Sequence, residues 1–594
     1  MGRLGWIVTV IAISSLALNA PALTRIMRSG CRMATSWQDG FRSTGEQVDA
    51  ARRMAAKAKV NGKSVGYCCS CEKGLLPIER SRILAMSWVA MPDFVPFGPM
   101  RDMIGKDAIV VAEYDPVADK ELGLAGYHIV EHGGGVNLWY RGREWTACSY
   151  KQEQGRIAEF ASVAVFVLFL VGCFYIRGCE GCVLGITALS LMTFVSVGIF
   201  GVMSVGVMSA FMLFAWGLLW LLTRGRAVRW HGRAVDSSNQ FCVRGAVISL
   251  LAMAFTSLAL THTFVTPNGL GTVGGKAKLM LLSAGFPLDF FIDPSYAPFQ
   301  PAYPPGAASL VMWCYVIGGL CGEWFIQVIP CLLMALLAGY LMSRIKSAFG
   351  VIIVAVVFLT PLSVRLATLF YPEVYVAICC LIGWERVRKD RFDQLGWMLI
   401  GLSGWFKNEG FVYFIALASG FMAFTPLHSW KHLLRKLAVS ATLPVAWHLS
   451  CRIAGASLDG YHHLDEISVA QGIMAFRYAI GAMFYSAWQF AFAYPAAVFV
   501  LFNKEWRSFS IKVALVGVLM SVFMFVIVFA LSDAVDFEWH LESLERILWV
   551  PSLVLVRELL DAIAPSLRDG HVEQTRKRDL VIRRSLVEAP SLNG

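Results

Sequence analysis

The residues that invite a chemical interpretation are charged side chains at the ends of long apolar segments. Glu373 follows Tyr371 between two such segments, and Lys407 and Glu409 share the next short turn. Arg546 stands at the start of a late apolar segment. An ionisable side chain at membrane level is costly to place, so each of these residues is a functional candidate. A carboxylate in such a position can remove a proton from a hydroxyl or an amine, and Lys or Arg can stabilise a phosphate.

The other candidates lie in segments that we expect on the same side of a membrane. They are Lys276, Lys278, Asp289, Arg365 and His540. Asp293 and Tyr303-Pro304-Pro305 follow Asp289 in the same loop. Carboxylates and cations from distant parts of the chain are therefore expected to meet at one membrane–water interface. Such an arrangement holds an anionic headgroup while its lipid tail stays in the bilayer.

Each candidate also has a structural alternative. Lys407 and Glu409 can simply pair with each other at a helix end. Arg365 can extend its guanidinium to the interface while its stem stays in the membrane. Asp289 can be an ordinary loop residue, and Tyr303-Pro304-Pro305 can merely begin a helix.

The composition indicates which elements position these residues. Of the 594 residues 57% are hydrophobic and 16% charged, whereas a soluble globular protein has about 25% charged residues. Several apolar segments reach the roughly 20 residues that cross a bilayer. These numbers exclude a soluble enzyme, a fibrous protein and a disordered chain. They predict a polytopic α-helical membrane protein.

The positions of the basic residues predict the topology. The net charge is +11, but Lys and Arg gather in short loops between apolar segments, as in cytoplasmic loops, which argues against a nucleic-acid partner. The basic loops lie at 224–233, 344–346, 386–391, 431–436 and 504–512, and basic residues recur at 576–584. All become cytoplasmic if the chain has fourteen spans, both termini are cytoplasmic, and 307–321 is a half-helix on the outer side. The spans are then 5–23, 158–176, 183–202, 204–223, 243–263, 325–342, 349–370, 373–385, 393–406, 411–427, 434–450, 475–502, 511–531 and 546–563.

This topology divides the chain into five parts. The outer segments are 24–157, 264–306, 451–474 and 532–545. The parts are a first span or signal anchor at 1–23, an extracytoplasmic domain at 24–157, three additional spans with a basic loop at 158–242, a transmembrane core at 243–565 and a basic cytoplasmic tail at 566–594. Residues 1–23 can instead be a cleaved signal peptide, which also leaves 24–157 outside.

The 24–157 segment is expected to be a small α/β domain. Its pattern predicts helices over 47–58 and 76–88, a strand over 108–113, and a hairpin of 127–130 with 136–140. Its cysteines are Cys31, Cys68, Cys69, Cys71 and Cys148. Disulfides are favoured outside the cytoplasm, with free thiols or a metal site as alternatives. The cytoplasmic Cys179-Glu180-Gly181-Cys182 is expected to be inert.

Four pieces of the chain resemble the GT-C superfamily of polyprenyl-phosphate-sugar-dependent glycosyltransferases, which includes protein O-mannosyltransferases and the lipid A aminoarabinose transferase. The similarity covers roughly 243–563 and rests on the order of these pieces. They are Lys276-Ala277-Lys278 with the following loop through Tyr303-Pro304-Pro305, Tyr371-Pro372-Glu373, Trp405-Phe406-Lys407-Asn408-Glu409-Gly410, and Trp539-His540 with Arg546.

The resemblance implies inverting transfer of a sugar from a lipid phosphate, with an acidic base in the first outer loop. The position expected for that base holds Asn268, and an amide is not a general base at neutral pH. Glu373 or Asp289 is then the expected base, and Lys276, Lys278, Arg365, Tyr371, Lys407, Glu409, His540 and Arg546 are expected to bind donor phosphate and substrate. We expect no cofactor, and no multi-carboxylate cluster demands a metal.

The function expected is transfer of a sugar from a polyprenyl-phosphate donor to an envelope glycan, lipid or protein on the outer face of the bacterial cytoplasmic membrane. A partner of the 24–157 domain is not indicated by the sequence. Two alternatives stay open. One is a catalytically inactive scaffold or lipid-binding partner, which Asn268 motivates. The other is a transporter of lipid-linked or anionic solutes, although no inverted pair of broken helices is evident.

Overall fold

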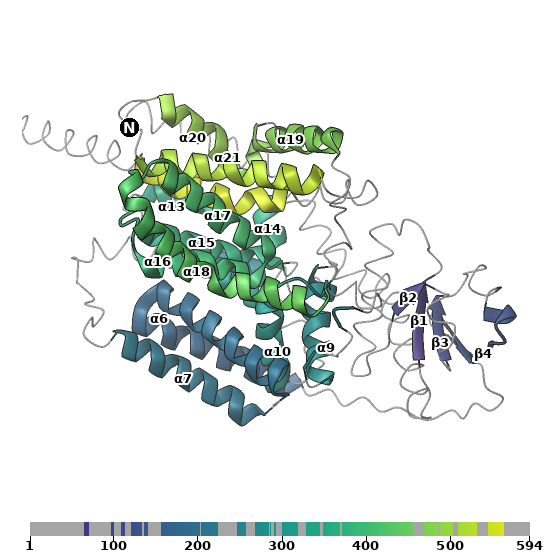
Figure 1. Ribbon diagram of the computed structural model, residues 1–594. Helices are drawn as coiled ribbons and strands as arrows, with labels where there is room; N and C mark the ends of the chain where they lie inside the picture. Colours follow the sequence, from purple (N-terminus) through teal and green to yellow (C-terminus); the bar gives the residue numbers. More distant parts are fainter. Residues whose placement is uncertain are drawn as a thin grey trace, which may run out of the picture.

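A computed structural model shows a mostly helical chain with one small sheet (Figure 1). It describes residues 65–69, 97–99, 108–112, 120, 122–133, 136–140, 156–201, 204–223, 246–256, 268–283, 285–286, 290–292, 300–318, 328–344, 348–368, 371–456, 468–484, 486–502, 509–530 and 544–562. The predicted helices at 47–58 and 76–88 and the predicted first span lie outside these ranges.

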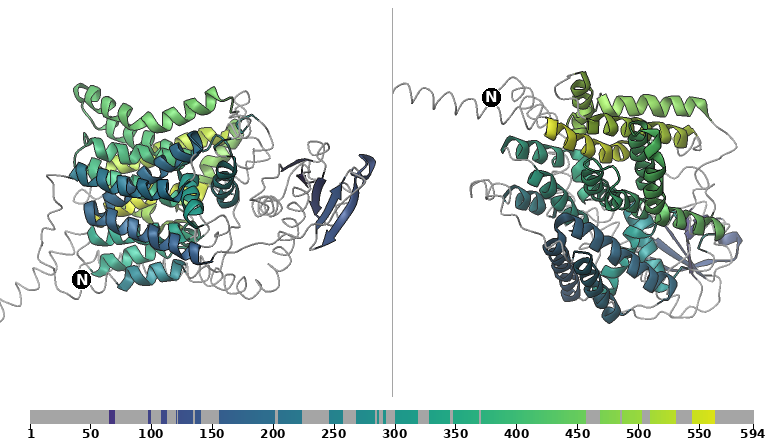
Figure 2. Two further views of the ribbon diagram at one scale, coloured as in Figure 1. Left: turned by 90° about the horizontal axis from the view of Figure 1, so that it is seen from below. Right: turned by 60° about the vertical axis from the view of Figure 1, so that its left-hand side comes forward.

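Five short strands form one mixed sheet, which the left view of Figure 2 draws apart from the helices. The strands are β1 (Val65–Cys69), β2 (Phe97–Pro99), β3 (Ala108–Ala112), β4 (His128–Gly133) and β5 (Val136–Tyr140), in the order β2-β1-β3-β5-β4. β1 pairs in parallel with β2 and β3, and β5 pairs antiparallel with β3 and β4. The predicted strand and hairpin are confirmed, whereas β1 and β2 were not predicted. The cysteine side chains expected to form disulfides lie outside the described part.

The helices follow the apolar segments of the sequence. They are α6 (Arg156–Thr193), η1 (Phe194–Ile199), α7 (Val205–Thr223), η2 (Asn268–Gly275), α9 (Lys276–Leu282), α10 (Gly306–Gly318), α12 (Val328–Arg344), α13 (Ala348–Phe358), α14 (Pro361–Thr368), α15 (Glu373–Val387), α16 (Gln394–Phe406), α17 (Asn408–Ala423), α18 (Leu427–Ile453), α19 (Val469–Phe484), η4 (Ala487–Phe490), α20 (Ala493–Phe502) and α21 (Phe509–Ala530). Residues 246–256 and 544–562 are helical as well.

Length and composition make part of this helical chain able to cross a membrane. Two described helical segments, 164–199 and 509–528, qualify alone, and α13 with α14 makes a third if the bent pair is one span. Shorter apolar helices accompany them, among them α10, α12, α19 and α20. These features are compatible with a helical membrane protein.

The segment 164–199 is a helical hairpin and not one straight helix. Gly178 has a φ of +65°, and the chain reverses there. Cys182 Sγ lies 3.5 Å from the carbonyl oxygen of Leu170, although residues twelve apart in a straight helix are about 18 Å apart. A Cβ on Gly181 would lie 2.2 Å from the carbonyl oxygen of Cys173, so glycine permits the close contact between the two arms. The predicted break between 176 and 183 is confirmed.

Two of the predicted spans are each divided into two helices in the structure. The predicted span 349–370 is divided into α13 and α14, which meet at an angle of 62°. Pro361 begins α14, where its missing N–H costs nothing, and this explains the break. The predicted span 475–502 is interrupted between α19 and α20, where Ala491 and Phe492 have positive φ values.

The middle of the chain forms the tightest packing. α16 contacts α15, α17 and α18, and α17 contacts α21. A Cβ on Gly401 of α16 would lie 2.2 Å from the carbonyl oxygen of Ser440 in α18, so these two helices touch through their backbones. Trp384 and Trp397 are fully buried in this core. α10 is buried as well and its 13 residues span about 20 Å, too short for a bilayer core of roughly 30 Å.

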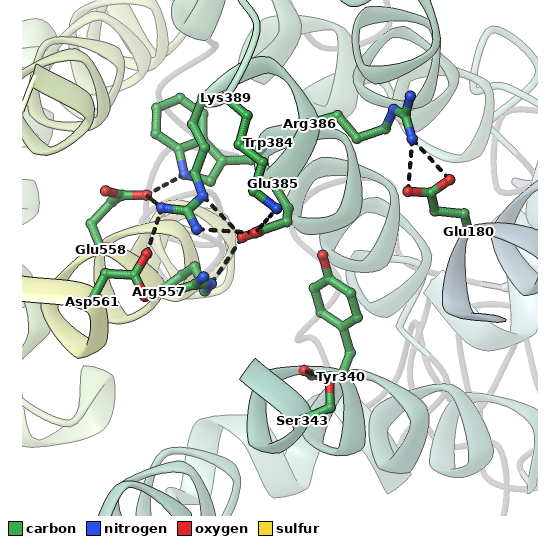
Figure 3. Close-up of polar contacts among 11 residues, drawn as sticks. Glu180, Tyr340, Ser343, Trp384, Glu385, Arg386, Lys389, Arg557, Glu558 and Asp561 are labelled. Atoms are coloured by element: carbon green, nitrogen blue, oxygen red, sulfur yellow. Dashed lines mark hydrogen bonds and ion pairs between the residues drawn. The ribbon is translucent and has the colours of Figure 1, made fainter. Parts of the chain in front are cut away.

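A cluster of ion pairs surrounds the C-terminal end of α15 (Figure 3). Glu385 accepts from Arg388 at 2.9 Å and from Arg557 at 3.0 Å, which joins α15 to the helix at 544–562. Arg386 pairs with Glu180 of the α6 hairpin at 2.8 Å. The loop predicted to be cytoplasmic at 386–391 thus contacts the hairpin turn predicted to be on the same side. Glu373 lies at the opposite end of α15, about 18 Å from Glu385 by helix rise.

Candidate functional site

A second group of charged residues meets at the N-terminal end of α15, on the side that the topology predicts to be external. The turn between α16 and α17 supplies two of its members. Lys407 breaks the helix with an extended backbone, at φ −159° and ψ 147°. The turn is tight, because a Cβ on Gly410 would lie 2.2 Å from the carbonyl oxygen of Ser403. The hydroxyl of Ser403 also donates to the Gly410 carbonyl at 2.9 Å.

Three ion pairs connect four side chains into what we call the outer cluster: Glu373, Lys407, Glu409 and Arg546. Lys407 Nζ lies 3.0 Å from Glu373 Oε1 and 2.7 Å from Glu409 Oε1. Arg546 Nη1 lies 3.2 Å from the same Glu373 Oε1. Glu373 and Lys407 are almost fully buried, with side chains 3% and 4% exposed. Buried charges of this kind are stable only when they are paired, and here two cations balance two carboxylates.

Aromatic residues hold Arg546 in place. The centroid of the Tyr371 ring lies 4.5 Å from Arg546 Cζ, within the range of a cation–π contact. Tyr303 lies close enough to Arg546 to interact with it electrostatically. The hydroxyl of Tyr413 in α17 donates to the Ile547 carbonyl at 2.5 Å, which fixes the start of the last helix against α17.

Three oxygen atoms of this site are buried without a hydrogen-bond partner among the described residues. They are Glu373 Oε2, Glu409 Oε2 and Asn408 Oδ1. Both carboxylates of the outer cluster thus use one oxygen for ion pairs and leave the other unused. An unsatisfied buried polar group costs about 1–3 kcal/mol, so three at one place need an explanation. All three atoms are acceptors, and a ligand that donates hydrogen bonds would satisfy them.

The lysines of the first outer loop lie in a different environment. Lys276 Nζ donates to the carbonyls of Gln300 and Tyr303, both at 2.8 Å, and Lys278 Nζ lies 5.5 Å from the ring centroid of Tyr315. Both lysines are buried. Burial lowers the pKa of Lys276 to about 7. The contacts of Lys276 fix the loop that leads into α10.

The structure brings five of the predicted site residues together: Tyr371, Glu373, Lys407, Glu409 and Arg546. Arg365 is exposed in the last turn of α14 and makes no hydrogen bond or ion pair with the described residues. Asp289 and His540 lie outside the described part of the chain. The backbone of Asn268 begins η2, and its side chain is likewise outside it.

Sequence reasoning missed Asn408 and Tyr413. Asn408 was quoted only as part of a motif, and its position between two charged residues of a short turn was the available signal. Nothing in the sequence pointed to Tyr413, whose partner lies 134 residues later. Among the described residues, no group of three or more His, Cys, Asp and Glu side chains is arranged to hold a metal ion.

Comparisons with known proteins do not identify a relative. No family model, curated protein or solved structure matches the chain.

Proposed function

We propose that this protein is a GT-C-like glycosyltransferase of the bacterial cytoplasmic membrane, with about fourteen spans, a core at 243–565 and an extracytoplasmic domain at 24–157. It would transfer a sugar from a polyprenyl-phosphate donor to an envelope acceptor on the outer face. The observation that carries this proposal is the outer cluster, in which a buried carboxylate, Glu373, has one oxygen without a partner among the described residues and lies beside two cations.

The chemistry follows from the two oxygens of Glu373. Oε1 is held by Lys407 and Arg546, and Oε2 is available to accept the proton of an acceptor hydroxyl. The acceptor oxygen then forms a bond to the anomeric carbon of the sugar. The bond between that carbon and the phosphate oxygen breaks on the opposite side, and polyprenyl phosphate leaves. Such a single displacement inverts the anomeric configuration.

Charge balance supports the same division of roles. With Glu373 ionised, the two carboxylates neutralise Lys407 and Arg546. When Glu373 takes the proton, one positive charge is uncompensated at the moment when the leaving phosphate gains negative charge. Cations placed where charge develops stabilise a transition state. Proton transfer and leaving-group stabilisation are thus coupled through one ion-paired group.

The test is donor turnover by purified protein in nanodiscs with a panel of polyprenyl-phosphate sugars. We expect wild type to release polyprenyl phosphate and Glu373→Gln to lose about 10²–10⁴-fold in rate, the usual contribution of a general base. Glu180→Gln is the matched control, because Glu180 is also an ion-paired carboxylate but lies at the other end of the bundle. The proposal would be overturned if folded wild type released no polyprenyl phosphate from any donor, or if Glu373→Gln kept full activity.

A further inference from the structure

A large apolar cavity lies far from the outer cluster, between the α6 hairpin, the helix at 246–256 and α12. Its volume is about 610 Å³, within the usual 300–1,000 Å³ of ligand sites. Apolar side chains such as Leu170, Val171 and Leu336 form most of its wall. The hydroxyl-bearing residues of its wall, Tyr340 and Ser343, lie at one end of the cavity, near the C-terminal end of α12.

That end of the cavity is on the side predicted to be cytoplasmic. Phe174 and Cys179, which flank the turn of the α6 hairpin, line it together with Ser343. Glu180 in the same turn pairs with Arg386, and in Figure 3 the ring of Tyr340 extends from α12 toward the side where this pair lies. The cavity therefore extends from the cytoplasmic boundary toward the middle of the helices. Its mouth is accessible, because the Val171 and Phe174 side chains are 58% and 42% exposed.

The volume fits a hydrocarbon chain better than a further helix. A methylene group is about as large as a water molecule, whose share of liquid volume is about 30 Å³, so the cavity has room for roughly 20 such groups. A helix of 20 residues, about 30 Å long and 10 Å wide, occupies roughly 2,000 Å³ or more. The predicted first span at 5–23 is thus too large to fill it.

The charged residues near the mouth of the cavity indicate which lipid headgroup fits there. In the sequence, the two segments that supply most of the wall, 167–182 and 332–346, carry three basic residues and one acidic residue, all of them in the turn and the loop that we predict to be cytoplasmic. The basic residues are Arg177, Arg344 and Lys346. Arg177 has a side chain that is 18% exposed, and it donates to Glu180 through Nε at 3.2 Å. The sequence thus predicts an excess of basic residues at the polar end of the cavity, and such an excess complements an anionic lipid.

We propose that this cavity binds one acyl chain of an anionic glycerophospholipid of the cytoplasmic leaflet, with the headgroup at Arg177 and Ser343. The lipid fills the space between α6 and α12 and joins the hairpin to the core. The site is independent of the chemistry at the outer cluster. Because its occupant enters from the inner leaflet, it is also distinct from any donor bound at the outer face.

The first experiment compares two tryptophan variants. Val171→Trp places an indole in the cavity from an exposed wall position, and Leu213→Trp does the same on α7 outside it, where Leu213 is 64% exposed. Each methylene group that can no longer be buried weakens binding about fourfold. Native mass spectrometry after delipidation should find one anionic phospholipid on wild type and on Leu213→Trp. It should find at least roughly tenfold less on Val171→Trp, since two or more methylene groups lose their place.

A second experiment needs no substitution. Cys179 lines the cavity and is partly exposed, so its alkylation by N-ethylmaleimide, followed by peptide mass spectrometry, reports on occupancy. We expect vesicles of phosphatidylglycerol to slow alkylation of delipidated protein and vesicles of phosphatidylcholine to do so much less. Equal protection by both lipids would overturn the assigned headgroup, and retention of polyprenyl phosphate would overturn the assigned occupant. Equal lipid on both tryptophan variants would show that the lipid binds elsewhere, and protection of Cys179 in lipid-free protein would show that the chain itself fills the cavity; either result overturns the proposal.

Discussion

Replacing Lys407 by Met removes the cation that joins Glu373 to Glu409. Glu373 keeps its contact with Arg546, but Glu409 loses the ion pair at 2.7 Å, and its other oxygen already lacks a partner in the part of the chain that the structure describes. Breaking a buried ion pair by removing one partner costs about 3–5 kcal/mol, chiefly because a charge is left uncompensated. We therefore expect Lys407→Met to lower the free energy of unfolding by about 3 kcal/mol or more.

A double-mutant cycle with Glu373→Gln measures how much of that loss comes from the contact between Lys407 and Glu373. If Lys407 and Glu373 interact as the 3.0 Å contact indicates, the second substitution removes part of the uncompensated charge, and the double variant is more stable than the sum of the two losses. Coupling between residues in contact is about 0.5–3 kcal/mol. The assay is thermal or denaturant unfolding in detergent at constant lipid content.

A matched cycle pairs Lys407→Met with Glu180→Gln. Glu180 lies at the other end of the bundle and shares no partner with Lys407, so these losses should add to within about 0.5 kcal/mol. Equal coupling in both cycles, or strict additivity between Lys407 and Glu373, would refute the geometry of the outer cluster. This result does not depend on any donor or acceptor being known.

Three further predictions concern the turn, the loop and the topology. Gly410→Ala should destabilise the protein by about 1–3 kcal/mol in unfolding assays, because the new Cβ meets the Ser403 carbonyl at 2.2 Å, whereas Gly217→Ala in α7 meets nothing within 4 Å and should be neutral or stabilising. Burial lowers the pKa of Lys276 from the ordinary 10.5 of a lysine to about 7, so between these pH values the unfolded chain binds a proton that the folded chain does not. Stability should then rise with pH from about 7 to 10.5, by at most about 1.4 kcal/mol per unit, and Lys276→Met should abolish that slope in melting curves; an unchanged slope would refute the assignment. Cys179 should react with a membrane-impermeant thiol reagent only from the cytoplasmic side of sealed vesicles, and reaction from the outside would invert the predicted topology.

The local parts of the fold were predictable because they depend on neighbouring residues. The run at 108–113 and the glycines before Val136 were sufficient for β3 and the hairpin, and the gap between the apolar segments 158–176 and 183–202 located the hairpin of α6. β1 was missed because its pairing with β2 and β3 is distant in sequence and its five residues show no strong alternation. The breaks at Pro361 and Ala491 were missed because apolar composition continues through them, so length alone suggested single spans.

The same distinction applies to the outer cluster. The cost of charge at membrane level indicated Glu373, Lys407 and Arg546 individually, and the alternation of basic loops predicted their common side. Their pairing depends on how α15, α17 and the last helix pack, which no local pattern encodes. Arg365 shows that charge at membrane level alone does not identify a site residue, because it lies exposed and without a partner in the described structure.

The charge count of the outer cluster restricts the class of ligand that fits it. Two cations and two carboxylates leave no net charge, and the unused atoms of Glu373, Asn408 and Glu409 are all acceptors. A simple anion brings further acceptors and no donors, so it would leave these oxygens unsatisfied and compete with carboxylates already paired to Lys407 and Arg546. A sugar brings hydroxyl donors for the three oxygens, and its phosphate gains a free cation only when Glu373 is protonated. The cluster is therefore better suited to a ligand that carries hydroxyls and phosphate together than to transport of an anionic solute, which is the physical reason to favour transfer over transport.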